Sequence, residues 1–208
     1  MKNLLSLFSF FLIFFSAQSQ TGQWIELFNG KDLEGWEISE NPSSFSVVDG
    51  MIKVDGPRAH AFYQGPVGNH DFKDFELLVE VKTMPKANSG IFIHTQYQES
   101  GWPNKGYEIQ VNQSHSDWRK SGSLYSFNDV RDVYVEDGEW YTYHIIVKGD
   151  QAMVKINDRI VMEYDESEDS NRPENAGMKE FDRGTIALQA HDPESVIYYR
   201  SVKIKLLD

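Results

Sequence analysis

Three short segments of the sequence alternate aliphatic side chains with carboxylate, amide and imidazole ones. Each has the period of two that is typical of a β-strand, so successive side chains face opposite ways. The segments are residues 90–96, 107–112 and 185–191. The polar faces of these segments carry His94, Glu108, Gln110, Gln189 and His191. Carboxylate and amide groups pair well with hydroxyl groups, so the pattern predicts a carbohydrate groove without indicating one reaction.

Aromatic and amide residues in the same regions extend this prediction. Trp102 and Tyr125 lie in loops, where their rings could stack on the apolar face of a sugar. We assign Gln110 and Gln189 to substrate hydroxyls, with the alternative that they only tie strands together. Asn88 either hydrogen-bonds the sugar or shapes its own turn.

Strands and turns must position these residues. Glycine, proline, asparagine and aspartate punctuate the chain about every eight to twelve residues, a spacing typical of sandwiches and barrels. No long segment has a convincing helical period, so any helices should be short. We therefore predict an all-β sandwich of about a dozen strands. The strands that the pattern predicts are 45–48, 51–54, 75–82, 90–96, 107–112, 140–148, 152–156, 160–164, 185–190 and 196–206.

The beginning of the sequence has the parts of a secretory signal peptide. Lys2 precedes an apolar run over 4–15, and a small polar stretch with Ala17 and Ser19 follows. The run is too short to cross a bilayer core of about 30 Å. This predicts residues 1–19 as a signal, residues 20–208 as one domain, and a secreted or periplasmic location.

Composition excludes several classes of function. The net charge of −12 argues against nucleic acid and anionic membrane surfaces as partners. The chain has no cysteine, which excludes thiol nucleophiles and cysteine zinc sites. No HExxH or GxSxG motif occurs, and the acidic segment 165–182 lacks the spacing of an EF-hand. We expect no cofactor and no metal.

Motifs in a fixed order resemble one known family. The chain is similar to the DUF1080 family, also called the 3-keto-disaccharide hydrolase domain, over roughly residues 23–207. The motifs that carry the resemblance are at 24–36, 88–92, 106–110, 122–125, 138–143, 157–161, 184–191 and 199–204. Two positions depart from the family pattern: Ser201 stands where Asn is usual, and Asp158 stands where Gly is usual.

The resemblance implies a fold and an activity. It implies a concanavalin A-like jelly-roll β-sandwich of two antiparallel sheets, with a polar site on the concave sheet. It also implies a protein exported from the cytoplasm that cleaves 3-keto-glycosides or 3-keto-disaccharides.

A 3-keto sugar opens a route that ordinary glycosides lack. The ketone acidifies the hydrogen at C2, so a base could form an enolate that expels the aglycone from C1, and this route needs an acid, a base and an enolate-stabilising group. We predict Glu108 and His191 as the acid/base pair, in either order. Arg200 is a candidate clamp for an oxyanion or hydroxyl, or a partner of Glu108. His94 is a weaker candidate for ligand contact.

Two other functions are also compatible with the sequence. A non-catalytic carbohydrate-binding module would use the same sandwich, because a fold alone does not establish an activity. A conventional glycosidase would need a second carboxylate, and Glu108 is the one acidic side chain on the polar faces of the three strands.

Overall fold

The computed structural model describes residues 21–172 and 176–207. The predicted signal peptide at 1–19 lies outside the described residues. Within these two ranges, no helix is long and apolar enough to cross a membrane.

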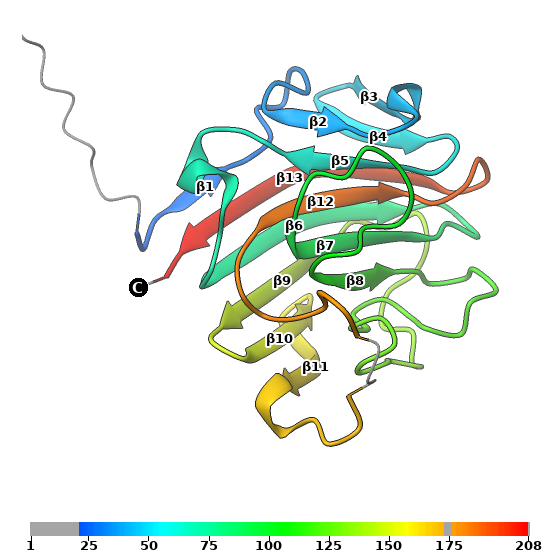
Figure 1. The fold of residues 1–208 in the computed structure, drawn as a ribbon. Helices are drawn as coiled ribbons and strands as arrows, with labels where there is room; N and C mark the ends of the chain where they lie inside the picture. Colours follow the sequence, from blue (N-terminus) through cyan, green and yellow to red (C-terminus); the bar gives the residue numbers. More distant parts are fainter. Residues whose placement is uncertain (1–20, 173–175, 208) are drawn as a thin grey trace, which may run out of the picture.

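Two antiparallel β-sheets are stacked face to face (Figure 1), which confirms the predicted all-β sandwich. The larger sheet has the order β11-β10-β9-β6-β13-β4-β3, with β1 paired to β13, and the smaller has the order β2-β5-β12-β7-β8. The strands of the larger sheet are β1 (Trp24–Glu26), β3 (Phe45–Val48), β4 (Met51–Asp55), β6 (Phe75–Thr83), β9 (Tyr141–Lys148), β10 (Gln151–Ile156), β11 (Arg159–Asp165) and β13 (Val196–Leu206). Those of the smaller sheet are β2 (Trp36–Ile38), β5 (Ala59–Tyr63), β7 (Ser89–Thr95), β8 (Tyr107–Val111) and β12 (Thr185–Ala190). Three short 3-10 turns are the only helices of the described residues: η1 (Pro42–Ser44), η2 (Val67–His70) and η3 (Glu166–Glu168).

The core lies between the sheets. Every second residue of β6 is buried, as expected for a strand with one face in the core and one in solvent. These residues join one apolar cluster with the inward side chains of the smaller sheet, including Ile91, Ile109 and Leu188. The two sheets therefore share a single hydrophobic core.

The smaller sheet differs because its outer face is also covered. All residues of β5, β7 and β12 are buried. A second small apolar cluster, of Phe62, Phe92 and Ala187, lies on the face opposite the core. Loops must therefore cover this outer face, and the polar side chains that alternate with the core residues lie beneath those loops.

Candidate active site

A pocket of about 720 Å³ opens on the outer face of the five-stranded sheet. Strands β8 and β12 supply Glu108, Gln110 and Gln189, and the loops around residues 102–104 and 176–179 enclose the pocket. The sequence placed nine residues at the site, and seven of them line this pocket: Asn88, Trp102, Glu108, Gln110, Tyr125, Gln189 and His191.

Glu108 lies half-buried on β8, the edge strand of the five-stranded sheet, and lines the pocket. Its cross-strand neighbour on β7 is Phe92, and the side-chain amide of Gln189 donates a hydrogen bond of 3.1 Å to its Oε1. Burial raises the pKa of the Glu108 carboxyl to about 7, although Gln189 and nearby Lys179 oppose the shift. A carboxyl group that titrates near neutrality is suited to accept or donate a proton.

The raised pKa of Glu108 predicts how stability depends on pH. The folded state holds this proton more tightly than the unfolded chain, where the pKa is near the ordinary 4.5. The stabilising contribution is therefore complete below about pH 4.5 and is lost as the pH rises through about 7. Glu108→Gln stays neutral, so it should become more stable than the wild type over this range, by at most about 3 kcal/mol. Urea unfolding at pH 4.5 and 8 measures this difference, and equal stability of the two proteins at pH 8 would contradict the assignment.

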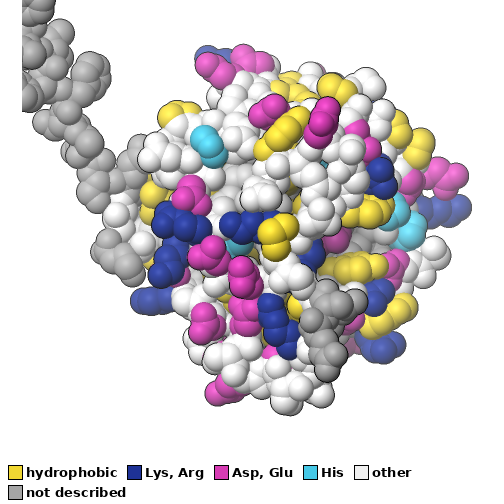
Figure 2. All heavy atoms as spheres, viewed as in Figure 1, with side chains coloured by type: hydrophobic (Ala, Val, Ile, Leu, Met, Phe, Trp, Pro, Cys, Tyr) yellow, Lys and Arg dark blue, Asp and Glu magenta, His cyan; other side chains and the backbone are white. Residues whose placement is uncertain are grey.

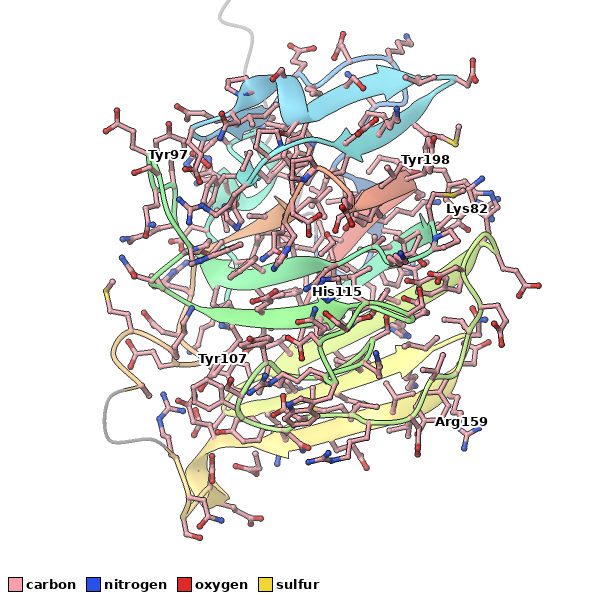
Figure 3. The ribbon with its side chains drawn as sticks, turned by 90° about the vertical axis from the view of Figure 1, so that its right-hand side faces the viewer. Lys82, Tyr97, Tyr107, His115, Arg159 and Tyr198 are labelled. Atoms are coloured by element: carbon pink, nitrogen blue, oxygen red, sulfur yellow. The ribbon has the colours of Figure 1, made fainter. Side chains whose placement is uncertain are left out.

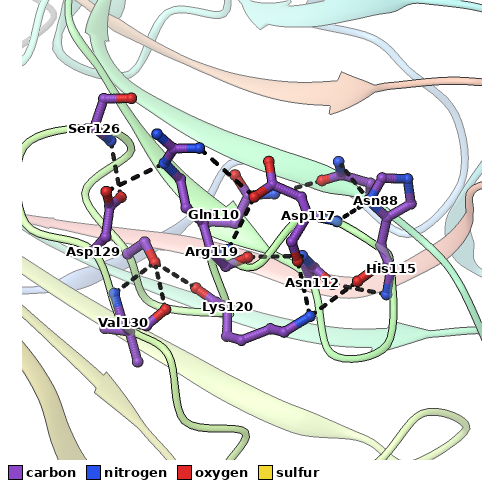
Figure 4. Close-up of polar contacts among 11 residues, drawn as sticks. Asn88, Gln110, Asn112, His115, Asp117, Arg119, Lys120, Ser126, Asp129 and Val130 are labelled. Carbon is purple, nitrogen blue, oxygen red and sulfur yellow. Dashed lines mark hydrogen bonds and ion pairs between the residues drawn. The ribbon is translucent and has the colours of Figure 1, made fainter.

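Amide side chains continue the polar floor of the pocket (Figure 4). Gln110 donates through Nε2 to Oδ1 of Asn88, and Nδ2 of Asn88 lies 3.4 Å from Nδ1 of His115. The Oε1 atoms of Gln110 and Gln189 are buried and accept no hydrogen bond from the described residues. Unpaired buried acceptors cost free energy, so a ligand that donates hydrogen bonds here would be favoured.

His191 follows β12 and makes a close pair with its neighbour in the sequence. Its Nδ1 lies 2.7 Å from Oδ2 of Asp192. Burial works to raise the pKa of Asp192, but hydrogen bonds from His191 and Ser195 outweigh it and lower that pKa. An ionised carboxylate only accepts hydrogen bonds, so Nδ1 of His191 carries the proton of this pair.

Trp102 forms an aromatic wall beside His191. The two rings have centroids 5.4 Å apart, and the Trp102 side chain is 45% exposed. Its loop is anchored by the Arg58–Glu40 ion pair, because Glu40 also accepts a hydrogen bond from the backbone of Gly101. Arg58 additionally lies 5.0 Å from the centroid of the Trp102 ring. The exposed ring is thus held in place as a platform for an apolar sugar face.

The structure places His94 and Arg200 outside the pocket. His94 has a left-handed backbone, with φ of 52°, which interrupts the alternation assumed for its strand. Its Nε2 lies 2.7 Å from the carbonyl oxygen of Lys73, and its ring packs on Phe75 of the core. Strand alternation therefore predicted the wrong face for His94.

Arg200 belongs to the other sheet, on β13. Its Nε lies 2.5 Å from Oε2 of Glu80, and its guanidinium group lies over the ring of Trp140. Period-two alternation indicates which side of a strand a residue occupies, but it does not indicate which sheet the strand joins. We therefore remove Arg200 from the candidate site, and Gln189 takes the place proposed for it beside Glu108.

Loop residues that the sequence pattern missed complete the pocket. Lys179 and Asp117 both line it. Nζ of Lys179 donates a 2.8 Å hydrogen bond to the carbonyl oxygen of Pro103, and burial lowers the pKa of its ammonium group while Glu108 raises it. Asp117 accepts a hydrogen bond from the backbone of Arg119. Lys179 lies in an acidic segment whose composition is typical of a solvated loop, so the composition did not indicate that its side chain lines a pocket.

His60 lies on the same outer face but is fully buried. It is the cross-strand neighbour of Gln189, and its ring contacts the ring of Trp102 at 5.7 Å between centroids. Burial lowers the pKa of His60 to about 4, so the ring is neutral near pH 7. His60 supports the platform from below.

Charge around the pocket is mixed. On the face shown in Figure 2, acidic and basic side chains are interspersed, with hydrophobic side chains between them. In the side view, Tyr107 marks the start of β8 and His115 the loop that follows it (Figure 3). Across residues 21–172 and 176–207, no group of three or more histidine, aspartate or glutamate side chains is gathered closely enough to hold a metal ion.

Solved structures share the fold of this chain. A candidate glycosyl hydrolase from Parabacteroides distasonis has a TM-score of 0.76 at 23% identity, covering 89% of this chain and 94% of its own. A carbohydrate-binding module from Bacillus subtilis has a TM-score of 0.50 at 11% identity, covering 90% of this chain and 97% of the module. These similarities show a lectin-like two-sheet sandwich.

Sequence comparison identifies the family. A protein of Bacteroides thetaiotaomicron named 3-keto-disaccharide hydrolase is 26% identical over 230 residues, which cover 89% of this chain and 79% of that protein. The family model described as a 3-keto-alpha-glucoside-1,2-lyase-like domain matches residues 23–205. Because this match spans nearly all of the domain, the chain belongs to the family of 3-keto-alpha-glucoside-1,2-lyase-like domains.

Proposed function

We propose that this protein is an exported hydrolase that cleaves 3-keto-glycosides, such as 3-keto-disaccharides, in the pocket on its five-stranded sheet. The observation that carries the proposal is Glu108, a carboxyl group with a pKa near 7 that shares one pocket with the His191–Asp192 pair. Family membership and the Bacteroides thetaiotaomicron relative support the substrate class. The signal-like sequence at 1–19 supports export.

The proposed reaction is an elimination followed by addition of water. Glu108 removes the proton from C2, and the electrons of that C–H bond form the enolate with its charge on the C3 oxygen. The enolate collapses to the ketone, a C1–C2 double bond forms, and the C1–O bond breaks. Its electron pair leaves on the aglycone oxygen, which takes a proton from Nε2 of His191 in its doubly protonated, imidazolium form. Water then adds through its oxygen to C1 and gives its proton to His191, and Glu108, after exchange of its proton with solvent, returns a proton to C2.

The contacts of each residue support this division of roles. Glu108 lies among amide side chains and aromatic rings, and burial raises its pKa to about 7. Near neutral pH a substantial fraction of the molecules therefore carries the ionised carboxylate that can act as a base. His191 is held by Asp192, whose negative charge is placed to stabilise the positive charge of an imidazolium. The family description names a lyase, which fits the elimination in the first step. The relative is named a hydrolase, which fits the overall reaction.

A carbohydrate-binding module is the second candidate function. The Bacillus subtilis module shares the fold, and an anchored aromatic ring such as Trp102 would also serve binding alone. Binding alone, however, gives no reason for a carboxyl group to be buried at the floor of a pocket with a raised pKa.

Asp117 also lines the pocket, so the second carboxylate of a conventional glycosidase is available from a loop.

One assay separates these three functions. The purified protein is incubated with a 3-keto-disaccharide and, separately, with its unoxidised parent, and the released monosaccharides are measured. Cleavage of the keto sugar alone supports the proposed function. Cleavage of the parent at a similar rate would favour a conventional glycosidase, and binding without cleavage of either sugar would favour the binding module.

A further inference from the structure

The proposed elimination puts a negative charge on the C3 oxygen, and neither Glu108 nor His191 is available to stabilise it. Glu108 becomes the base for C2, and His191 serves the leaving oxygen at C1. The charge that develops on the enolate oxygen accounts for a large part of the barrier in reactions of this type, so a further group is required to stabilise it. We propose that the Lys179 ammonium group donates to the C3 oxygen and stabilises the enolate; this inference rests on the proposed function.

The position of Lys179 supports this role. It comes from the loop on the far side of the pocket, and its Nζ reaches to 5.7 Å from the centroid of the Phe92 ring. Phe92 is the cross-strand neighbour of Glu108, so Nζ lies over the strand pair that carries the base. A sugar bound between loop and sheet would thus have Glu108 and Lys179 close to adjacent carbon atoms.

The hydrogen bonding of Lys179 leaves donors free for a ligand. An ammonium group has three N–H donors, and the described contacts use one of them, to the carbonyl oxygen of Pro103 at 2.8 Å. Lys179 is also the only lysine or arginine among the described residues that line the pocket. In a half-buried pocket, a cation acts on developing charge more strongly than it would in water.

This placement gives the pocket an orientation and a preference for ketones. The C3 oxygen would face Lys179, the C2 hydrogen Glu108, and the C1 oxygen His191. A parent sugar with a hydroxyl group at C3 develops no charge there during the reaction. Lys179 would therefore favour the keto sugar in the transition state rather than in simple binding.

Two variants of Lys179 test the inference. Lys179→Met keeps the length of the side chain without its charge, and Lys179→Arg keeps the charge. With a 3-keto-disaccharide, Lys179→Met should lower kcat by about 10²–10³-fold and change KM by less than about threefold. Lys179→Arg should recover at least a tenth of the wild-type kcat. Lys105→Met is the matched control, because Lys105 pairs with Asp182 outside the pocket lining, and it should keep kcat within about twofold.

Each outcome separates this inference from the proposed function. If the wild type cleaves the keto sugar and Lys179→Met keeps its kcat while remaining folded, the role of Lys179 is wrong and the proposed function stands. A loss that appears only in KM, or that Lys179→Arg does not reverse, also overturns the role. If borohydride added during turnover attaches the sugar covalently to Lys179, Lys179 forms an imine with the ketone, and the proposed hydrogen-bonding role is wrong. If the wild type cleaves no keto sugar, the proposed function itself fails.

Discussion

Glu108→Gln should lower kcat for a 3-keto-disaccharide by about 10²–10⁴-fold while sugar binding remains measurable. Glutamine has the shape of glutamate and keeps an oxygen that can accept the hydrogen bond from Gln189, so the pocket should retain its form. It cannot accept the proton from C2, and loss of a general base typically costs this much in rate. Initial rates and titration calorimetry with the same sugar measure the two effects separately.

The control is a glutamate on the same sheet but outside the pocket. Glu37 is exposed on β2, and Glu37→Gln should leave kcat within about twofold of the wild type. Full activity of Glu108→Gln would remove Glu108 from the chemistry. Loss of binding together with turnover would make it a ligand contact instead of the base.

Gly90→Ala should lower kcat by about 10²-fold without unfolding the protein. Gly90 lies beside Glu108 on the neighbouring strand, and a Cβ atom built there would lie 2.7 Å from Cγ of Glu108. The Gly90 backbone is not left-handed, so alanine fits the strand and the carboxylate side chain must move. A displacement of about 1 Å at a reacting group can cost this much in rate. Steady-state kinetics and thermal melting measure the two quantities.

A double variant shows whether Gly90 acts through Glu108. Aspartate at position 108 is shorter by one methylene group and leaves room for the added methyl. Gly90→Ala should therefore cost much less in a Glu108→Asp background than in the wild type, which is the non-additivity expected of contacting residues. Equal costs in both backgrounds would mean that Gly90 affects activity by another route.

The sequence predicted which strand residues lie at the pocket wherever aliphatic and polar side chains alternate regularly. The sequences of β8 and β12 alternate aliphatic and polar side chains, and Glu108, Gln110 and Gln189 lie on the outer face as expected. β5 was missed because its short sequence, Ala-His-Ala-Phe-Tyr, does not alternate aliphatic and polar side chains throughout. A single left-handed residue, His94, was enough to reverse the predicted face.

Other features depend on contacts that a local pattern does not contain. The strand of Arg200 has a register shift between Tyr199 and Ser201, and its sheet is fixed by pairing with β4, β6 and β1, which are distant in the sequence. Lys179 comes from a loop, where no period indicates which way a side chain points. The room that Gly90 leaves for Glu108 likewise becomes visible only when the two strands are paired.

Isotope incorporation at C2 tests the central claim most directly. The wild-type protein is given a 3-keto-disaccharide in D₂O, and the released keto sugar is analysed by NMR at low conversion, with the isolated product incubated alone as the control for later exchange. Elimination through Glu108 followed by addition of water predicts one deuterium at C2 for each bond cleaved. Complete cleavage with hydrogen retained at C2 would contradict the elimination and indicate direct displacement at C1.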